Sequence, residues 1–299
     1  MIAIAESGST KTEWIILDEK SGEIIKSIRT AGFNPDFHSS EHITTTLNQS
    51  ADISKIKEEV KTVYFYGAGC SNVILNAIVS DALELVFTKA SITVDHDLLA
   101  AACSVYDGNE IICGILGTGS NSCYYDGQKI FEELPSLGFI AGDEGSGGSI
   151  GKRFLADYFY KKLPKEINND FKSTYKLTWA MARKEIYGSN HPNVYCASFM
   201  PFIAKYKETD YVKGIIRAEM KMFIDAHVKC FVNYSSNKVG FVGSIAYYFQ
   251  DILKEELEKE SFEFVHVIKN PAMNLVDYHR KYKINLATSQ ETVNNESNI

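Results

Sequence analysis

Short apolar runs separated by small polar turns open the chain. Residues 2–5 form an apolar run, and residues 6–12 form a turn of small and polar residues. A second apolar run at 14–17, a turn at 18–22 and a third run at 23–25 complete the pattern. Runs of this length between turn-forming residues predict three β-strands joined by two tight turns.

The same plan returns near residue 111. Apolar or aromatic runs at 111–116, 123–125 and 129–131 alternate with polar turns at 117–122 and 126–127. Gly8 and Gly119 then stand in equivalent turns, where glycine lets a backbone approach a ligand closely. The simplest explanation is two related α/β domains, 1–107 and 108–299, each opening with a β-meander. Whether a C-terminal helix after about residue 277 completes the first domain stays open.

Helical and strand patterns alternate between these two units. Residues 39–60 and 74–88 have helical spacing of apolar positions, residues 63–69 and 92–97 are strand-like, and residues 98–106 are again helical. This alternation predicts a parallel or mixed sheet covered by helices. The second half is more helical, with helices expected at 148–162, 170–187, 196–207 and 211–234, and a strand running into a helix at 239–246.

Composition and charge narrow the class of protein. The 299 residues are 45% hydrophobic and carry 31 basic and 38 acidic side chains, a net charge of −7. An acidic balance argues against a general nucleic-acid binder. No apolar run approaches the roughly 20 residues needed to span a bilayer, and the first residues lack a secretory signal, so no membrane partner is expected. The six cysteines are scattered without a C-x-x-C pair, which indicates buried thiols and a cytoplasmic location.

Glycine-rich turns locate the candidate chemistry. Nine of the twenty glycines fall between residues 117 and 151, interleaved with polar residues. The turns 8–12 and 117–121 offer backbone N–H groups and hydroxyls, and the first adds Lys11. Facing each other across a cleft, they would clamp the β- and γ-phosphates of a nucleotide, although neither is a Walker A or a Rossmann loop. The alternative is tight turns in two small meanders.

Carboxylates supply candidates for acid–base chemistry. Asp97 stands where a strand meets a helix, and phosphoryl transfer to a hydroxyl needs a carboxylate that takes its proton. A helix N-cap is the alternative role for Asp97. Asp95 and His96 are alternative candidates for the base; by strand alternation Asp95 shares a face with Asp97, whereas His96 points the other way and is expected to be structural. Asp143 and Glu144 lie in a glycine setting that suits sugar hydroxyls or metal-bound waters, or simply a surface turn. Asn34 is either a substrate-binding amide or part of a plain turn.

Four segments taken in order, GSTKTEW, VDHDLLAA, GTGSNS and GDEGSG, resemble the BadF/BadG/BcrA/BcrD-type ATPase family, and most closely its N-acetylglucosamine kinase branch. That family lies within the sugar kinase/Hsp70/actin superfamily. The resemblance runs from Ile2 to about Val276 and is strong at 2–14 and 92–155. It implies an actin-like, ribonuclease H-type fold in each half, with ATP and Mg²⁺ bound in an interdomain cleft.

The resemblance also implies roles for single residues. Asp97 matches the catalytic base of the kinases, and Glu6 would hold the metal through water. Ser7 stands where glycine is commoner and would crowd the loop, and the segment 35–37 does not match the aromatic-rich substrate segment of animal enzymes. Nucleotide-binding matches are Gly8, Ser9, Thr10, Lys11, Thr118, Gly119, Gly243 and Ser244, and sugar-binding matches are Asn34, Ser120, Asn121 and Asp143.

The resemblance implies an ATP-dependent sugar kinase that phosphorylates the 6-hydroxyl of N-acetylglucosamine or a related amino sugar, and a homodimer. Two alternatives stay open. An activator-type ATPase would couple hydrolysis to a partner through an iron–sulfur cluster, which the scattered cysteines disfavour because a cluster needs converging thiolates. A catalytically silent sugar or nucleotide sensor would bind without turnover.

Overall fold

The structure is a computed structural model that describes residues 1–8 and 11–284. Its contacts divide the chain into two compact units, Met1–Ser104 together with the segment from Pro271, and Val105–Asn270. The segment from Pro271 therefore returns to the first unit, where a completing C-terminal helix was one expectation. The functional boundaries of the two domains stay a prediction.

A five-stranded mixed sheet forms the centre of the first unit. The strand order is β3-β2-β1-β4-β5, with β1 antiparallel to β2 and parallel to β4. The central strand β1 therefore carries its last residues to the edge where the parallel strands β4 and β5 also end. The strands are β1 (Ile2–Ser7), β2 (Lys11–Leu17), β3 (Ile24–Ala31), β4 (Thr62–Gly67) and β5 (Ser91–His96).

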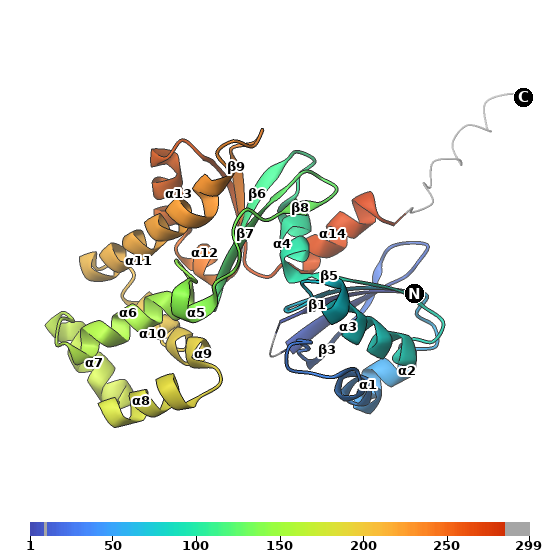
Figure 1. Cartoon of the computed structure of the whole chain (residues 1–299), viewed down its shortest axis with the longest axis horizontal. Helices are drawn as coiled ribbons and strands as arrows, with labels where there is room; N and C mark the ends of the chain where they lie inside the picture. Colours follow the sequence, from blue (N-terminus) through green and yellow to red (C-terminus); the bar gives the residue numbers. More distant parts are fainter. Residues whose placement is uncertain (9–10, 285–299) are drawn as a thin grey trace, which may run out of the picture. The chain divides into compact units, whose positions relative to one another are not determined.

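Helices cover both faces of this sheet. Figure 1 shows α4 and α14 on one side and α1 to α3 on the other. Trp14 is fully buried on the side of α1 to α3, where its ring contacts Phe65 and Phe87. The helix expected at 39–60 is two helices, because the Ser50 side chain caps a new helix start. The helices are α1 (Ser40–Gln49), α2 (Ala51–Ile56), α3 (Val73–Val86), α4 (Asp97–Val105) and α14 (Ala272–Tyr282).

The second unit repeats the topology of the first. Its sheet has the order β10-β9-β6-β7-β8, so β6 is central like β1, with an antiparallel hairpin on one side and two parallel strands on the other. The α/β fold with one strand plan used twice is thereby confirmed. The strands are β6 (Ile111–Leu116), β7 (Ser120–Tyr125), β8 (Ile130–Phe131), β9 (Lys238–Val242) and β10 (Glu263–Ile268).

Both meander turns are shorter than the pattern predicts. Ser120 pairs with Leu116 and Asn121 pairs with Ile115, so both belong to β7 and not to the turn. The reason is a tight reversal in which the Gly117 N–H donates to the Gly119 carbonyl (3.0 Å). In the first unit Lys11 likewise begins β2, and the Gly8 N–H donates to the Lys11 carbonyl (3.0 Å).

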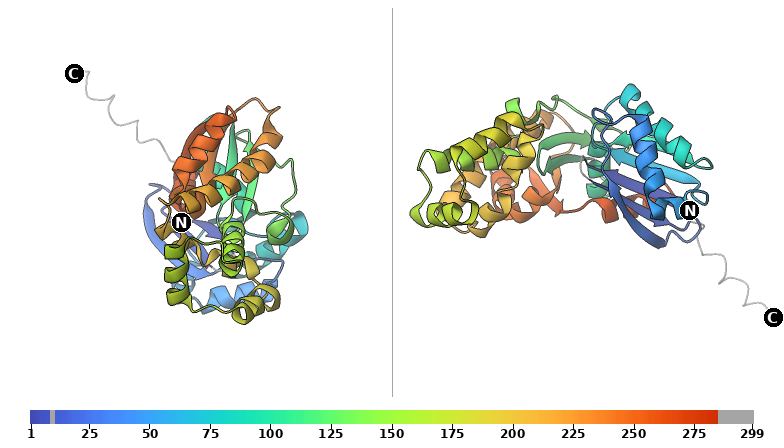
Figure 2. Two further views of the ribbon diagram at one scale, coloured as in Figure 1. Left: turned by 90° about the vertical axis from the view of Figure 1, so that its left-hand side faces the viewer. Right: turned by 90° about the horizontal axis from the view of Figure 1, so that it is seen from below.

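Two of the helices expected in the second half, 170–187 and 196–207, are each divided in two. The expected helix 170–187 breaks because Lys176 adopts a left-handed conformation (φ 46°) and Thr178 caps the next start. Figures 1 and 2 show α7 and α8 away from the sheet of this unit. The helices are α5 (Gly138–Ala141), α6 (Gly147–Phe159), α7 (Lys165–Tyr175), α8 (Trp179–Gly188), α9 (Pro192–Ala197), α10 (Met200–Lys205), α11 (Asp210–Phe223), α12 (Ser244–Tyr248) and α13 (Gln250–Lys259).

The expected helix 211–234 also ends early. The α-helical hydrogen-bond pattern of α11 stops at Phe223 and continues as a π-helical turn, Ile224–Val228, and a 3₁₀ turn, Lys229–Phe231. Among the residues that the structure describes, no helix is both long enough and apolar enough to cross a membrane.

Candidate active site

Glu6 is a half-buried carboxylate near the end of the central strand β1. Burial and the negative charge of Asp97 together raise its pKa to about 6, while Lys11 acts in the opposite direction. Glu13, its antiparallel neighbour on β2, adds to the rise. Glu6 and Asp97 are therefore electrostatic neighbours within the first unit.

Asp97 is the first residue of α4 and follows directly on β5. Its side chain is 36% exposed, and Oδ1 lies 2.9 Å from His96 Nδ1. The backbone N–H of Leu98 donates to the same His96 nitrogen (2.9 Å). His96 thus satisfies a backbone donor at the start of the helix, which matches its expected structural role, while the Asp97 carboxylate stays accessible.

Cys70 is the electrostatic neighbour of three carboxylates. Burial raises the pKa of the Cys70 thiol to about 12, and the charges of Asp97, Asp95 and Asp36 raise it as well. Asp36 follows Asn34 in the loop after β3, so this loop and the start of α4 both lie close to Cys70.

Asn34 is buried and shapes the loop that contains it. Its Oδ1 accepts the N–H of Asp36 (2.9 Å), and its backbone N–H donates to His38 Nδ1 (3.1 Å). Gly69 leaves the room for the carboxamide, because a Cβ there would lie 2.2 Å from Oδ1. Nδ2 has no hydrogen-bond partner among the described residues, so this amide can donate to a ligand.

Ser7 joins the β1–β2 hairpin to the segment that leads into Asn34. Its side chain is fully buried, its Oγ accepts the N–H of Phe33 (3.0 Å), and Thr12 Oγ1 lies 2.7 Å away. Thr12 Oγ1 donates to the carbonyl of Ala31 (3.0 Å). Ser7, where the resemblance leads one to expect glycine, is part of this buried network. Of the four residues expected in the first phosphate loop, Ser9 and Thr10 lie outside the described residues.

In the second unit the turn of Gly117 and Thr118 rests on the start of α6. The N–H of Gly147 donates to the Gly117 carbonyl (2.8 Å), and that of Gly148 donates to the Thr118 carbonyl (3.0 Å). A Cβ on Gly148 would lie 2.9 Å from the Thr118 oxygen, so the approach requires glycine. These two helix donors are occupied by the turn, while the Thr118 side chain is exposed.

Asp143 and Ser120 come together beside this turn. The Asp143 carboxylate is buried, its Oδ1 accepts the N–H of Ser120 (3.2 Å), and burial raises its pKa. Both carboxylate oxygens would lie 3.1 Å from a Cβ on Gly119. The Ser120 hydroxyl is buried and has no partner among the described residues. Asn121 is the next residue on β7, and its Oδ1 accepts the N–H of Ser122 (2.8 Å).

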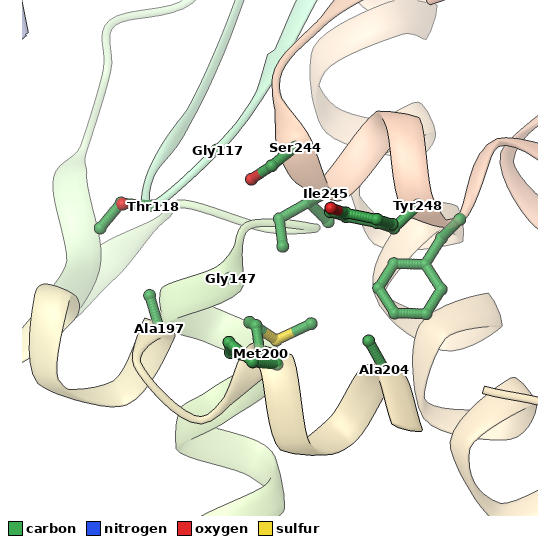
Figure 3. A pocket seen from close by; sticks show the side chains of 11 residues that line it. Gly117, Thr118, Gly147, Ala197, Met200, Ala204, Ser244, Ile245 and Tyr248 are labelled. Carbon is green, nitrogen blue, oxygen red and sulfur yellow. The ribbon is translucent and has the colours of Figure 1, made fainter. Parts of the chain in front are cut away.

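A pocket of about 460 Å³ opens next to the Thr118 turn. Figure 3 shows the hydroxyl-bearing side chains of Thr118, Ser244 and Tyr248 around the same opening as the apolar Met200 and Ile245. The remaining lining residues are Gly117, Gly147, Ala197, Pro201, Ala204 and Phe249.

Gly243 packs against β6 next to the pocket residue Ser244. Its φ of 118° is accessible mainly to glycine, and a Cβ would lie 2.3 Å from the Leu116 carbonyl. Gly243 thereby lets the start of α12, with Ser244, approach β6. The structure thus brings Thr118 and Ser244 to one pocket, as the motifs predict for nucleotide contacts. The α9 and α10 residues of the pocket were missed, because small and apolar residues at helical spacing look like ordinary core.

Comparisons with known proteins place this geometry in a family. No family model matches the chain, and no curated protein matches it in sequence. The crystal structure of a "putative N-acetylglucosamine kinase" from Porphyromonas gingivalis matches with a TM-score of 0.87 and 32% sequence identity. The match covers 94% of this chain and 99% of that one. This chain belongs to the sugar kinase family.

Two more distant structures share the fold. A "putative N-acetylglucosamine kinase" from Chromobacterium violaceum has a TM-score of 0.65 and 14% identity over 93% of this chain and 98% of its own. A ROK-family glucokinase from Streptomyces griseus, solved with glucose and AMPPNP, has a TM-score of 0.57 and 14% identity over 93% and 99%. The expected actin-like fold of sugar kinases is therefore confirmed, while the roles of the single residues stay predictions.

Proposed function

We propose that this sugar kinase transfers the γ-phosphoryl group of ATP to the 6-hydroxyl of N-acetylglucosamine or a related amino sugar. We further propose that it belongs to the N-acetylglucosamine kinase branch of the BadF/BadG/BcrA/BcrD-type family. The observation that carries the proposal is the 32% identity, over 94% of the chain, with a protein described as a "putative N-acetylglucosamine kinase". The arrangement of carboxylates in the first unit supports it.

Asp97 is the proposed general base. In the reaction a bond forms between the sugar oxygen and the γ-phosphorus, the bond to the β-phosphate oxygen breaks, and the hydroxyl proton passes to the carboxylate. Such a base must be accessible to substrate and held in a fixed place. Asp97 is 36% exposed and begins a helix directly after a strand, which meets both requirements.

The pocket of the second unit is the proposed site of the adenosine. Its volume of about 460 Å³ and its walls of Met200, Ile245 and Phe249 suit an apolar ring. The hydroxyls of Ser244 and Tyr248 supply polar partners for the ribose. Thr118, at the rim, is the proposed contact to the phosphate chain, and the AMPPNP of the S. griseus neighbour supports ATP as the phosphoryl donor.

Glu6 fits the proposed role of holding Mg²⁺ through water. The pKa of about 6 reflects a half-buried carboxylate that feels the charge of Asp97, and a nearby divalent cation would favour the ionised form of Glu6. Mg²⁺ prefers oxygen ligands and usually keeps several waters while contacting one or two carboxylates and substrate phosphates. When bound, the ion neutralises charge on the phosphates.

Four side chains are the proposed contacts to the sugar. The Asn34 carboxamide keeps its Nδ2 available, and the Ser120 hydroxyl is buried without a partner within the described residues. A buried polar atom of this kind costs free energy unless a ligand pairs with it. Asp143 and Asn121 lie beside Ser120 and complete the set.

Sugar-dependent release of ADP tests the proposal. We expect turnover with N-acetylglucosamine at a higher kcat/KM than with glucosamine, N-acetylmannosamine or glucose. Release of ADP at one rate with and without every sugar would instead indicate an activator-type ATPase. Saturable binding of sugar and nucleotide without any ADP release would indicate a sensor.

A further inference from the structure

A second recess lies in the helical part of the second unit, outside the candidate active site. It has a volume of about 530 Å³ and is formed by the end of α6, by α7 and by the start of α8. Figures 1 and 2 show α7 and α8 at a distance from the sheet that carries Thr118. None of its lining residues belongs to the nucleotide or sugar contacts proposed above.

Three lysines line this recess, and no carboxylate does. Lys161, Lys165 and Lys172 form no ion pair with any residue in the described ranges 1–8 and 11–284, and the protein as a whole carries a net charge of −7. Glu166 is next to Lys165 in sequence, but adjacent residues on a helix do not face each other. Asp157, the acid nearest to Lys161 in sequence, contacts Arg153 and Tyr211.

The other carboxylate of α7 is occupied elsewhere. Asp170 accepts hydrogen bonds from Lys205 (2.7 Å) and from the Tyr206 hydroxyl (2.8 Å). All three lysines are exposed. Like charges that line one recess repel one another, and an anion bound there would relieve this repulsion. The recess therefore has the charge that suits an anionic ligand.

An aromatic wall faces the same recess. Trp179 lines it and is 52% exposed, while its ring makes an edge contact with Phe159 (5.4 Å between centroids). An exposed indole offers a flat apolar surface for the body of a ligand. Asn168 and Thr178 also line the recess and supply hydrogen-bonding groups.

We propose that this recess binds an organic phosphate monoester. The phosphate lies among Lys161, Lys165 and Lys172, and the organic body packs against Trp179. Sugar phosphates and nucleoside monophosphates share this chemistry, and the two are distinguished by experiment. The proposal does not rest on the proposed kinase reaction, because it uses none of the same residues.

The fluorescence of Trp179 provides a direct reporter. The chain has two tryptophans, and the other, Trp14, is fully buried in the first unit. Titration of the full chain with glucose 6-phosphate and with uridine monophosphate is compared with glucose, uridine and inorganic phosphate. The test variant is Lys165→Gln/Lys172→Gln, and the control is Lys184→Gln/Lys20→Gln, which removes equal charge from exposed positions outside the recess.

We expect a saturable change in emission with at least one of the two esters and none with glucose or uridine. The ester that binds identifies the ligand as a sugar phosphate or as a nucleoside monophosphate. Half-saturation should rise at least tenfold in the test variant and change less than twofold in the control, and Trp179→Phe should remove the signal. Melting temperature and sugar-dependent ADP release of the test variant should match those of the unsubstituted protein.

Two results would overturn the proposal. One is the absence of any lysine-dependent response to either ester. The other is binding of inorganic phosphate as tightly as both esters, since this would leave Trp179 without a role. Either result can occur while the kinase reaction proceeds, so failure of this site and failure of the proposed function are distinguishable.

Discussion

At the scale of single residues, ionisation of Glu6 carries an energetic cost in the folded protein. Its folded-state pKa of about 6 lies above the ordinary value of 4.5, because burial and Asp97 disfavour the charged form. The folded protein therefore binds this proton more tightly than the unfolded chain does. Stability falls as the pH rises from 4.5 to about 6, and above this range the cost is about 2 kcal/mol.

Substitution of Glu6 by Gln should remove this cost. The variant should be more stable than the unsubstituted protein by about 2 kcal/mol at pH 8, with the difference vanishing below pH 4.5, and should lose most of its kinase activity. Urea unfolding at a series of pH values measures the difference. Glu23→Gln, at an exposed position, is the control. A gain of the same size at every pH would show that ionisation is not the cause.

Ser7 is predicted to position Asn34 through the segment before it. In Ser7→Ala the N–H of Phe33 loses its acceptor, and a buried unpaired donor costs about 1–3 kcal/mol. We expect a lower free energy of unfolding and a higher KM for the sugar, with the KM for ATP unchanged. Steady-state kinetics separate the two constants, and Ser54→Ala, at an exposed position, is the control. An equal rise in both KM values would argue against a positioning role.

Which residues were predictable depends on the kind of signal they carry. Asp97, Thr118 and Ser244 stand at junctions of strands with turns or helices, where polar residues are informative. Met200 and Ala204 lie within α10, and their spacing is that of any helix packed on a core. Only the folded chain shows that these apolar residues line a pocket and not a closed interior.

At the scale of elements, the meanders were predictable and the helix breaks were not. Glycines and polar residues mark the turns after β1 and β6. The alternation of apolar runs with polar turns is therefore enough to predict both meanders. The end of α7 has no such mark, because Lys176 occupies the left-handed position where glycine is usual. The strand order of each sheet depends on long-range pairing, which periodicity along the chain does not reveal.

Helix α14 is bound to the first unit through a buried histidine. His279 is fully buried, its Nε2 lies 3.0 Å from the Tyr66 hydroxyl, and its ring packs on Tyr64. Burial lowers its pKa to about 3, while the unfolded chain titrates near 6.5. The stability that this neutral ring provides is therefore complete above pH 6.5 and is lost as the pH falls toward 3.

His279→Gln should reduce the loss of stability at acid pH. The shift corresponds to about 4 kcal/mol between pH 6.5 and 3, and glutamine keeps hydrogen-bonding capacity without a titrating group. Chemical denaturation at pH 7 and at pH 4.5 should show a smaller loss of stability in the variant than in the unsubstituted protein. His191→Gln, at an exposed position, should leave the pH dependence unchanged. An equal loss of stability at pH 4.5 in His279→Gln and in the unsubstituted protein would show that His279 is not the cause.

At the scale of the whole molecule, one strand topology serves two purposes. The first unit carries the carboxylates Glu6 and Asp97 near the ends of β1 and β5, and the second carries a pocket beside the turn after β6. The repeat itself was visible in the sequence, because both copies keep the same order of strands and turns. The difference between the carboxylates of one copy and the pocket of the other was not visible, because it depends on the helices that each copy adds.

The central claim is that this sugar kinase uses Asp97 as its base. Sugar-dependent ADP release by Asp97→Asn, compared with Asp81→Asn at an exposed position on α3, tests it most directly. We expect kcat to fall by roughly 10²–10⁴-fold in Asp97→Asn, with an unchanged melting temperature, and to stay the same in Asp81→Asn. Turnover of Asp97→Asn close to that of the unsubstituted protein would show that Asp97 is not the base.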